Sequence, residues 1–304
     1  MMQLLLMYTL FAATFIAGQQ AVIWCPPYTF IAIRMIIAGV LFLSWLWLVR
    51  RTTIFFAPAD RLRFAILAAV HIAIAYSCEF WSLQKVPAAI VALIWNLSPF
   101  ITAIMAYGLQ GSRATWLQVV GMIIGFAAVL PIVGGATAMQ DLWCLTEESF
   151  GATVLVLISV ISSCYGWILF NQLQNRGYST MTLNAWAMLL GGLYLLPLLP
   201  IELATTSTAI NPLGTLAMLL FLILIGNVLA YNLYGKLLPV YGPTTLAFGG
   251  AIIPVITAGM QWLVFGQTVT QLFWLSIGGI IIAFAFFFHD TVSRFIGRQP
   301  DVKA

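Results

Sequence analysis

A seven-residue sequence occurs twice in this chain, and the repetition constrains its architecture more than any other feature. The first copy is Pro-Phe-Ile-Thr-Ala-Ile-Met at 99–105, and the second is Pro-Val-Ile-Thr-Ala-Gly-Met at 254–260. The offset of 155 positions holds without a gap from Tyr76/Tyr231 to Leu117/Leu272. A constant offset over this length indicates an internal repeat, which predicts a fold built from two copies of one unit.

The repeated unit is expected to fold inside a lipid bilayer. Of the 304 residues, 62% are hydrophobic and 7% are charged, whereas soluble proteins carry about 25% charged residues. The apolar runs are continuous, which favours helices of roughly 20 residues over a barrel. The first run lacks a basic segment before it and is interpreted as a retained helix, not a cleaved signal. The sequence predicts ten spans, at 2–23, 28–49, 62–84, 87–108, 114–133, 150–173, 180–200, 212–236, 243–265 and 269–288.

These spans divide into two halves. We expect a first five-helix repeat at 1–133, an external linker at 134–149, a second repeat at 150–289 and a cytoplasmic tail at 290–304. Because five is odd, the second repeat enters the membrane in the opposite orientation. With both termini in the cytoplasm, the inner segments hold ten Lys and Arg residues and the outer ones only Lys85, as the positive-inside rule requires. The predicted fold is an all-α membrane protein of ten transmembrane helices in two inverted repeats, an arrangement typical of secondary transporters.

Several features together resemble the drug/metabolite transporter superfamily, of the EamA-like type. They are the five-plus-five spans, Arg34 after Pro27 in the second span, the passage from Tyr76 to Pro99, and the glycine-spaced fifth and tenth spans (Gly121, Gly125, Gly278 and Gly279). The sequence departs from many relatives in span one, where Gly18-Gln19-Gln20 replaces a charged or Trp-Gly signature. The resemblance implies a multi-pass protein of a bacterial-type inner membrane. Such relatives export amino acids and other metabolites, take up S-adenosylmethionine, or exchange sugar nucleotides.

Glu79 is the sharpest candidate for a functional residue. An ionised carboxylate within a span is costly unless it is paired or wetted, so it normally faces an interior cavity. Arg34 lies at a similar depth in the second span. Two interpretations stay open: a structural Arg34–Glu79 ion pair, or a Glu79 that binds a cationic group of the substrate or carries a coupling proton.

The other candidates share a mid-span position and a polar or aromatic side chain. Tyr76 lies on the same helix face as Glu79. His71 is interpreted as a proton relay or as a structural residue. For each candidate, interhelical packing or hydrogen bonding is the alternative role. The predicted substrate-binding residues are Glu79, Tyr76, Trp95, Asn96, Arg34, Gln19, Tyr165, Asn227, Tyr231 and Phe248.

The leading interpretation is a secondary-active, alternating-access transporter of a small polar metabolite. One buried acid and one buried base suit an amino acid or an amino-acid-derived compound such as S-adenosylmethionine. Direct drive by ATP is not expected, because the sequence holds no GxxxxGK[ST] motif. One alternative is a membrane-embedded lipid-modifying enzyme, which would need convergent catalytic groups. The other is a nucleotide-sugar or nucleoside exchanger, for which binding of the pyrophosphate would require more positive charge than Arg34 supplies.

The expected partners are the metabolite, the lipid bilayer and a coupling proton or counter-substrate. We expect no enzyme activity, catalytic residue, cofactor, metal or nucleic acid. The four cysteines show no CxxC or metal-ligand spacing, although Cys25 and Cys144 are both expected outside, where a disulfide is conceivable. The Gly121-x3-Gly125 motif would serve either a weak dimer or helix packing within a monomer.

Overall fold

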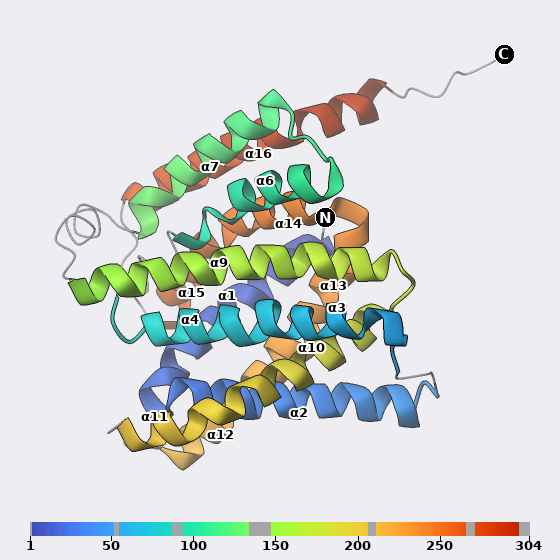
Figure 1. Cartoon of the computed structure of the whole chain (residues 1–304). Coiled ribbons are helices and arrows are strands. Elements are labelled where there is room, and N and C mark those ends of the chain that lie inside the picture. Colours follow the sequence, from blue (N-terminus) through green and yellow to red (C-terminus); the bar gives the residue numbers. More distant parts are fainter. Residues whose placement is uncertain are drawn as a thin grey trace.

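The computed structural model describes residues 2–51, 55–86, 91, 94–133, 147–205, 211–265 and 271–297. Every regular element in these ranges is helical, and the helices pack into one bundle (Figure 1). Within these ranges, seven helical segments are long and apolar enough to cross a membrane. Two shorter apolar helices, Trp116–Leu130 and Phe273–His289, and the helix at Ser98–Gln110 complete ten hydrophobic segments. The predicted all-helical membrane fold is therefore confirmed.

The helices of the first half begin and end close to the predicted boundaries. The third span is one long helical run in three pieces, preceded by a 3-10 turn. In chain order, the elements of the first half are α1 (Met2–Trp24), α2 (Pro27–Leu48), η1 (Pro58–Asp60), α3 (Arg61–Leu67), η2 (Ala68–Ile74), α4 (Ala75–Ser82), α6 (Ser98–Gln110) and α7 (Trp116–Val133). Part of the predicted fourth span, residues 87–90 and 92–93, lies outside the described residues.

The second half repeats this order. Its elements are α9 (Glu147–Gln174), α10 (Thr180–Leu195), η3 (Leu196–Leu198), α11 (Leu199–Thr205), α12 (Pro212–Phe221), η4 (Leu222–Ala230), α13 (Tyr231–Tyr241), α14 (Pro243–Gly249), η5 (Gly250–Ile252), α15 (Ile253–Phe265) and α16 (Gln271–Gly297). The last helix extends to Gly297, so it includes much of the segment expected to be a cytoplasmic tail. Most of the expected linker, residues 134–146, lies outside the described residues.

Proline and glycine set the helix boundaries. Pro27, Pro212 and Pro243 occupy the first helical turn of α2, α12 and α14, where the missing N–H costs nothing. Gly111, with a φ of 68°, closes α6 in the left-handed conformation, and Gly242, with a φ of 77°, separates α13 from α14. These conformations favour glycine because it lacks a Cβ.

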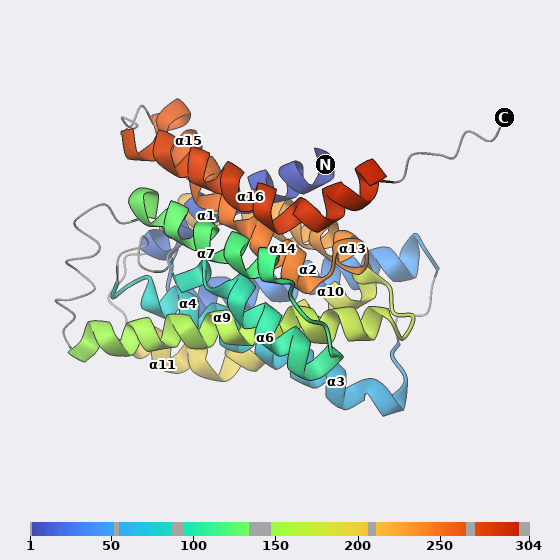
Figure 2. The ribbon, with the colours of Figure 1, turned by 90° about the horizontal axis from the view of Figure 1, so that it is seen from above.

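Helices pack in pairs that the repeat relates. The second helix of each half packs on its counterpart (α2 on α10), and so does the fifth (α7 on α16); α7 and α16 lie side by side in both views (Figures 1 and 2). α1 packs against η4 and α15, and α9 makes the equivalent contacts with η2 and α6. These contacts of one half have their equivalents in the other, so the two halves interlock around a common pseudo-two-fold axis.

Glycines let these paired helices approach closely. A Cβ built on Gly39 of α2 would lie 2.6 Å from the backbone N of Leu189 in α10. A Cβ on Gly121 of α7 would lie 2.8 Å from the backbone N of Phe287 in α16. Gly125 faces the Phe248 ring in the same region. The Gly121-x3-Gly125 motif therefore packs helices within this chain, as small residues commonly do in membranes.

Two π-helical segments occupy equivalent positions in the two halves. η2 covers residues 68–74, and the offset of 155 places its counterpart within η4, residues 222–230. The sequence pattern predicts uninterrupted helices in both places. A π-helical turn widens the helix locally, and such turns are frequent at functional sites. The segments carry His71 and Asn227 and continue directly into α4 and α13, so they shape the centre of the bundle.

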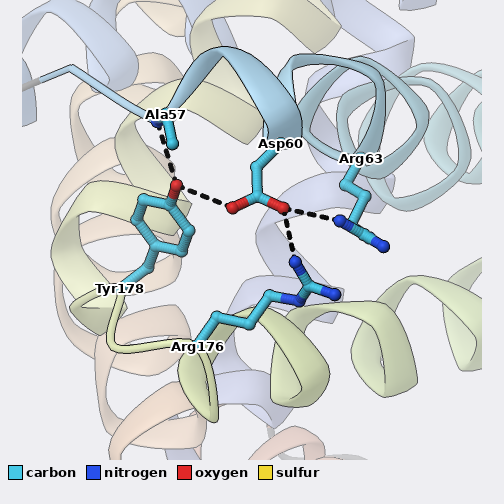
Figure 3. Close-up of polar contacts among 5 residues, drawn as sticks. All are labelled: Ala57, Asp60, Arg63, Arg176 and Tyr178. Carbon is cyan, nitrogen blue, oxygen red and sulfur yellow. Dashed lines mark hydrogen bonds and ion pairs between the residues drawn. The ribbon is translucent and has the colours of Figure 1, made fainter.

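A carboxylate joins the two halves at each end of the bundle. Figure 3 shows Asp60, before α3, accepting hydrogen bonds from Arg63 and Arg176 at 2.7 and 2.9 Å and from the Tyr178 hydroxyl at 2.9 Å. Arg176 and Tyr178 lie between α9 and α10, in the second half. Asp60 lies beyond the end of α2, and we call this end of the bundle the Asp60 end.

The opposite end, where α2 begins, carries a second such contact. Glu202 of α11 accepts hydrogen bonds from the backbone N–H groups of Tyr28 and Thr29, both at 2.7 Å. The Thr29 hydroxyl also donates to it at 2.8 Å. A carboxylate at a helix N-terminus satisfies free N–H groups and complements the helix dipole. Glu202 therefore fixes α11 of the second half to α2 of the first.

Candidate substrate-binding cavity

A cavity of about 550 Å³ lies between the two halves. Both copies of the repeated sequence reach it, through Thr102 and Thr257. Helices α1, α4, α6, α9, α13, α14 and α15 contribute to its walls, together with the η5 turn, Arg34 of α2 and Gly226 of η4. Small-molecule sites enclose about 300–1,000 Å³, so the cavity is large enough for a metabolite. Its position between the repeats is the one that inverted-repeat transporters use.

Arg34 forms part of the cavity wall, and residues next to the cavity fix its position. Its Nε donates to Oδ1 of Asn227 at 2.7 Å, and its guanidinium lies 5.5 Å from the ring centroid of Tyr76. The Asn227 amide nitrogen in turn contacts the sulfurs of Met35 and Met188 at 3.2 and 3.3 Å. Only 3% of Arg34 is exposed, so Asn227 and the aromatic face of Tyr76 stabilise a cation that the bundle has largely desolvated.

Glu79 also lines the cavity, from α4, but it is not paired with Arg34. Among the described residues, no ion pair within 4.0 Å joins these two side chains, and the charged contacts involve Asp60 instead. The direct ion pair of the structural interpretation is therefore not formed, since the Arg34 Nε faces Asn227, but Arg34 still attracts the Glu79 carboxylate across the cavity. A carboxylate with no cation in direct contact inside an apolar bundle is expected to face water or a positively charged ligand. Glu79 thus places an acidic side chain in the cavity wall.

Aromatic side chains form much of the remaining wall. Trp167 of α9 stacks on Tyr234 of α13 with ring centroids 4.0 Å apart, and Tyr231 packs against Trp167 at 5.4 Å. Trp95 lines the cavity too. Such rings can stack on a planar group of a ligand or face a cation.

Two buried polar atoms on the wall have no hydrogen-bond partner within the described chain. They are Nε1 of Trp95 and Oγ1 of Thr257. Buried polar groups are almost always hydrogen-bonded, and each exception calls for an explanation. Because both residues line the cavity, these atoms could bond to a molecule inside it.

The structure brings most of the predicted site residues together. Those that line the cavity are Glu79, Tyr76, Trp95, Asn96, Arg34, Gln19 and Tyr231. The other three do not line it. Asn227 is buried behind Arg34. Phe248, only 1% exposed, stacks on Phe287 at 4.1 Å in the packing of α14 against α16. Tyr165 packs against the hydrophobic core instead.

Sequence reasoning does not single out several of the wall residues. Trp167 lies two positions after Tyr165, and only its aromatic side chain marks it in the sequence. Tyr234 lies three positions after Tyr231 and therefore shares its helix face. Thr102 and Thr257 belong to the repeated sequence itself, which is the signal that could have identified them.

Two other predicted features lie outside the cavity wall. His71 is 1% exposed and packs edge-on against Trp167 at 4.4 Å, behind the aromatic wall. Cys25 is a free, buried cysteine, and Cys144, with which the sequence makes a disulfide conceivable, lies outside the described residues.

Comparison with known proteins identifies related sequences over most of the chain. The model of the EamA-like transporter family matches residues 1–134 and 150–288. A protein of Chlamydia trachomatis serovar L2, named S-adenosylmethionine/S-adenosylhomocysteine transporter, is 25% identical over 287 residues, which cover 92% of this chain and 86% of that protein. The uncharacterized inner membrane transporter YedA of Escherichia coli K12 is 23% identical over 280 residues, with coverages of 91% and 86%.

A solved structure supports the same fold. It is described only as "Crystal structure of protein", and it superposes with a TM-score of 0.77 over 97% of each chain. Its sequence is 14% identical to this one, so the likeness concerns the arrangement of the helices alone.

Proposed function

The chain belongs to the EamA-like transporter family, and we propose that it is a secondary-active carrier of S-adenosylmethionine or a closely similar amino-acid-derived cation. It is an integral, multi-pass membrane protein. We place it in a bacterial-type inner membrane with both termini in the cytoplasm, following the distribution of its basic residues. The cavity between the halves would open alternately to the two sides of the membrane.

The observation that carries this proposal is Glu79 among aromatic walls, without an ion-pair partner in the described part of the chain. S-adenosylmethionine carries a sulfonium, an ammonium, a carboxylate and a planar adenine. Glu79 would attract the positive groups, and Trp95 and Trp167 would stack on the adenine. Arg34 would receive the carboxylate, since a guanidinium has five N–H donors and the hydrogen bond to Asn227 uses only Nε.

The names of the chlamydial relatives support the same substrate class. Those proteins are named for a pair of compounds that differ by one methyl group and by the sulfonium charge. An exchange of the two across one site needs no ATP, and the bound counter-substrate would complete the return step of the cycle. We therefore favour exchange over transport of a single solute, with a coupling proton as the alternative.

A sugar-nucleotide exchanger of the same superfamily fits the cavity less well. Arg34 is the one basic residue among the described residues that line the cavity, and it is already hydrogen-bonded to Asn227. A pyrophosphate with two negative charges favours several charged donors and would be repelled by Glu79. The charge balance of the cavity therefore favours a cation.

Transport by the purified protein in lipid vesicles tests the proposal. We expect uptake of radiolabelled S-adenosylmethionine that unlabelled S-adenosylmethionine and S-adenosylhomocysteine inhibit, and that a uridine diphosphate sugar does not. Glu79→Gln should remove most of the uptake while the thermal unfolding midpoint stays close to that of the wild type. Tyr165→Phe, outside the cavity, should transport normally. Uptake of the sugar nucleotide in place of S-adenosylmethionine, or full activity in Glu79→Gln, would overturn the assignment.

A further inference from the structure

A second hollow lies on the outside of the bundle, between α6 and α7. This groove, of about 590 Å³, shares no lining residue with the central cavity in the described part of the chain. Its α6 wall is formed by Phe100, Ala103 and Ile104, and its α7 wall by Val119 and Met122. The α6 residues lie on one face because they are spaced three and four positions apart. Ile104 is 73% exposed, so the groove faces the surroundings of the bundle, which are lipid tails in a membrane.

A cation lies at one end of this apolar groove. Arg113, in the connection between α6 and α7, lines the groove, and its guanidinium lies 5.5 Å from the ring centroid of Tyr107. It is exposed, and no acidic side chain pairs with it among the described residues. Trp116, 75% exposed, lies three positions further along the chain. Tryptophan, tyrosine and arginine gather where lipid headgroups meet water, so these residues mark headgroup depth.

We propose that this groove binds an anionic phospholipid. The phosphate would lie at Arg113, and one acyl chain would run along α6 past Ile104 and Phe100. The match is one of charge and polarity: a cation at headgroup depth adjoins a channel of apolar side chains at tail depth. Basic residues near the membrane surface recognise anionic lipids in this way. A free phosphate would use the cation alone and leave the apolar channel unexplained.

The groove and the central cavity lie against the same helix, α6. Ser98 and Thr102 of α6 line the cavity, whereas Phe100, Ala103 and Ile104 line the groove. At 3.6 residues per turn these two sets point to different sides of the same helix. A lipid in the groove would therefore bear on a helix that forms the cavity wall. This consequence rests on the proposed transport function, but the lipid site itself does not.

Native mass spectrometry of protein released from vesicles tests the site. The probe is a mixture of phosphatidylethanolamine with a minor fraction of phosphatidylglycerol. We expect retained phosphatidylglycerol on the wild type and about fivefold less on Arg113→Gln, the factor that one basic residue near the surface contributes. Arg50→Gln, which removes an exposed cation outside the groove, should retain the wild-type amount.

A second variant separates the groove from the charge. Ala103→Trp fills the groove but keeps Arg113, and it should also lose the lipid while remaining folded by thermal unfolding. The proposal would be overturned by equal lipid retention in Arg113→Gln and the wild type. It would equally be overturned if inorganic phosphate raised the thermal unfolding midpoint as much as the lipid does. A dimer of the chain that forms in place of the lipid complex and is lost in Arg113→Gln would also overturn it. None of these results bears on which substrate the cavity carries.

Discussion

The phenolic oxygens of Tyr76 and Tyr231 lie 2.6 Å apart, and the two residues are 155 positions apart in the chain. This separation equals the offset of the internal repeat. Each tyrosine therefore hydrogen-bonds to its own counterpart in the other half. A residue can contact its counterpart only beside the axis that relates the halves, so the pseudo-two-fold axis passes through this hydrogen bond, on the wall of the cavity.

The shared hydrogen bond predicts non-additive effects from the two sides. Tyr76→Phe and Tyr231→Phe should each lower the free energy of unfolding by about 0.5–1.5 kcal/mol, since each removes one member of a buried hydrogen bond. The double variant should cost clearly less than the sum of the single variants, because both lose the same interaction. Reversible denaturation in detergent measures these values. Strict additivity would show that the two hydroxyls do not interact.

The contact around Asp60 predicts a change at one end of the bundle. Asp60→Asn removes the negative charge that binds Arg63 and Arg176. The two halves should therefore separate more often at the Asp60 end. Spin labels at Leu62 of α3 and Val240 of α13, both exposed, report the distance between the halves once the native cysteines are replaced. The distance distribution should broaden toward longer values in Asp60→Asn.

The carboxamide that Asp60→Asn introduces has the size of the original carboxylate, so a packing change would not explain such a result. Asp60→Glu serves as the control that keeps the charge, and it should retain most of the short-distance population. An unchanged distribution in Asp60→Asn would contradict a role of this contact in closing the Asp60 end.

Close packing of α2 on α10 predicts a strong effect at one glycine. Gly39→Ala places a Cβ 2.6 Å from the backbone of Leu189, and backbone atoms cannot yield as a flexible side chain can. The variant should lose about 1–3 kcal/mol of stability through overpacking. Gly108→Ala in α6 is the matched control, because its Cβ meets nothing within 4 Å and alanine favours the helix. A Gly39→Ala variant as stable as Gly108→Ala would show that α2 and α10 do not pack backbone to backbone.

Two aromatic residues of α9 provide a test of which helix face binds substrate. Trp167 lines the cavity and Tyr165 does not. Trp167→Leu should weaken binding of S-adenosylmethionine by about tenfold, the order of magnitude expected for one base stacked on an aromatic side chain. Tyr165→Leu, with the same replacement residue, should leave the Kd near the wild-type value. Titration calorimetry on detergent-purified protein measures both, and the reverse ranking would contradict a substrate site at the Trp167 face.

The depth of a residue within a span could be predicted from the sequence. Pro27, Gly111, Gly242 and Pro243 fix where helices begin and end, and each residue adds 1.5 Å of rise. Glu79, counted from its span end in this way, falls at a depth where it reaches the cavity. The arrangement of the second half could be predicted from that of the first, because one offset relates positions in the two copies.

The direction in which a side chain points could not be predicted in the same way. A helix that is apolar on all sides has no polar face to identify which side turns inward. Tyr165 and Trp167 differ by two positions, or about 200° around the helix, and only the fold decides which of them lines the cavity. Phe248 lies just before the 3-10 turn η5, and it packs outward against α16. The π-helical turns at 68–74 and 222–230 shift the faces of two more helices.

Counterflow in vesicles is the measurement that tests the central claim most directly. Vesicles that contain the purified protein are loaded with unlabelled S-adenosylmethionine and diluted into a trace of the radiolabelled compound. A carrier with one cavity between two inverted halves should take up label transiently beyond its equilibrium level, and Glu79→Gln should abolish this overshoot. Label that only rises to equilibrium would indicate a pore, and label that never enters the wild-type vesicles would contradict the substrate. Either result would overturn the proposal of an alternating-access carrier for S-adenosylmethionine.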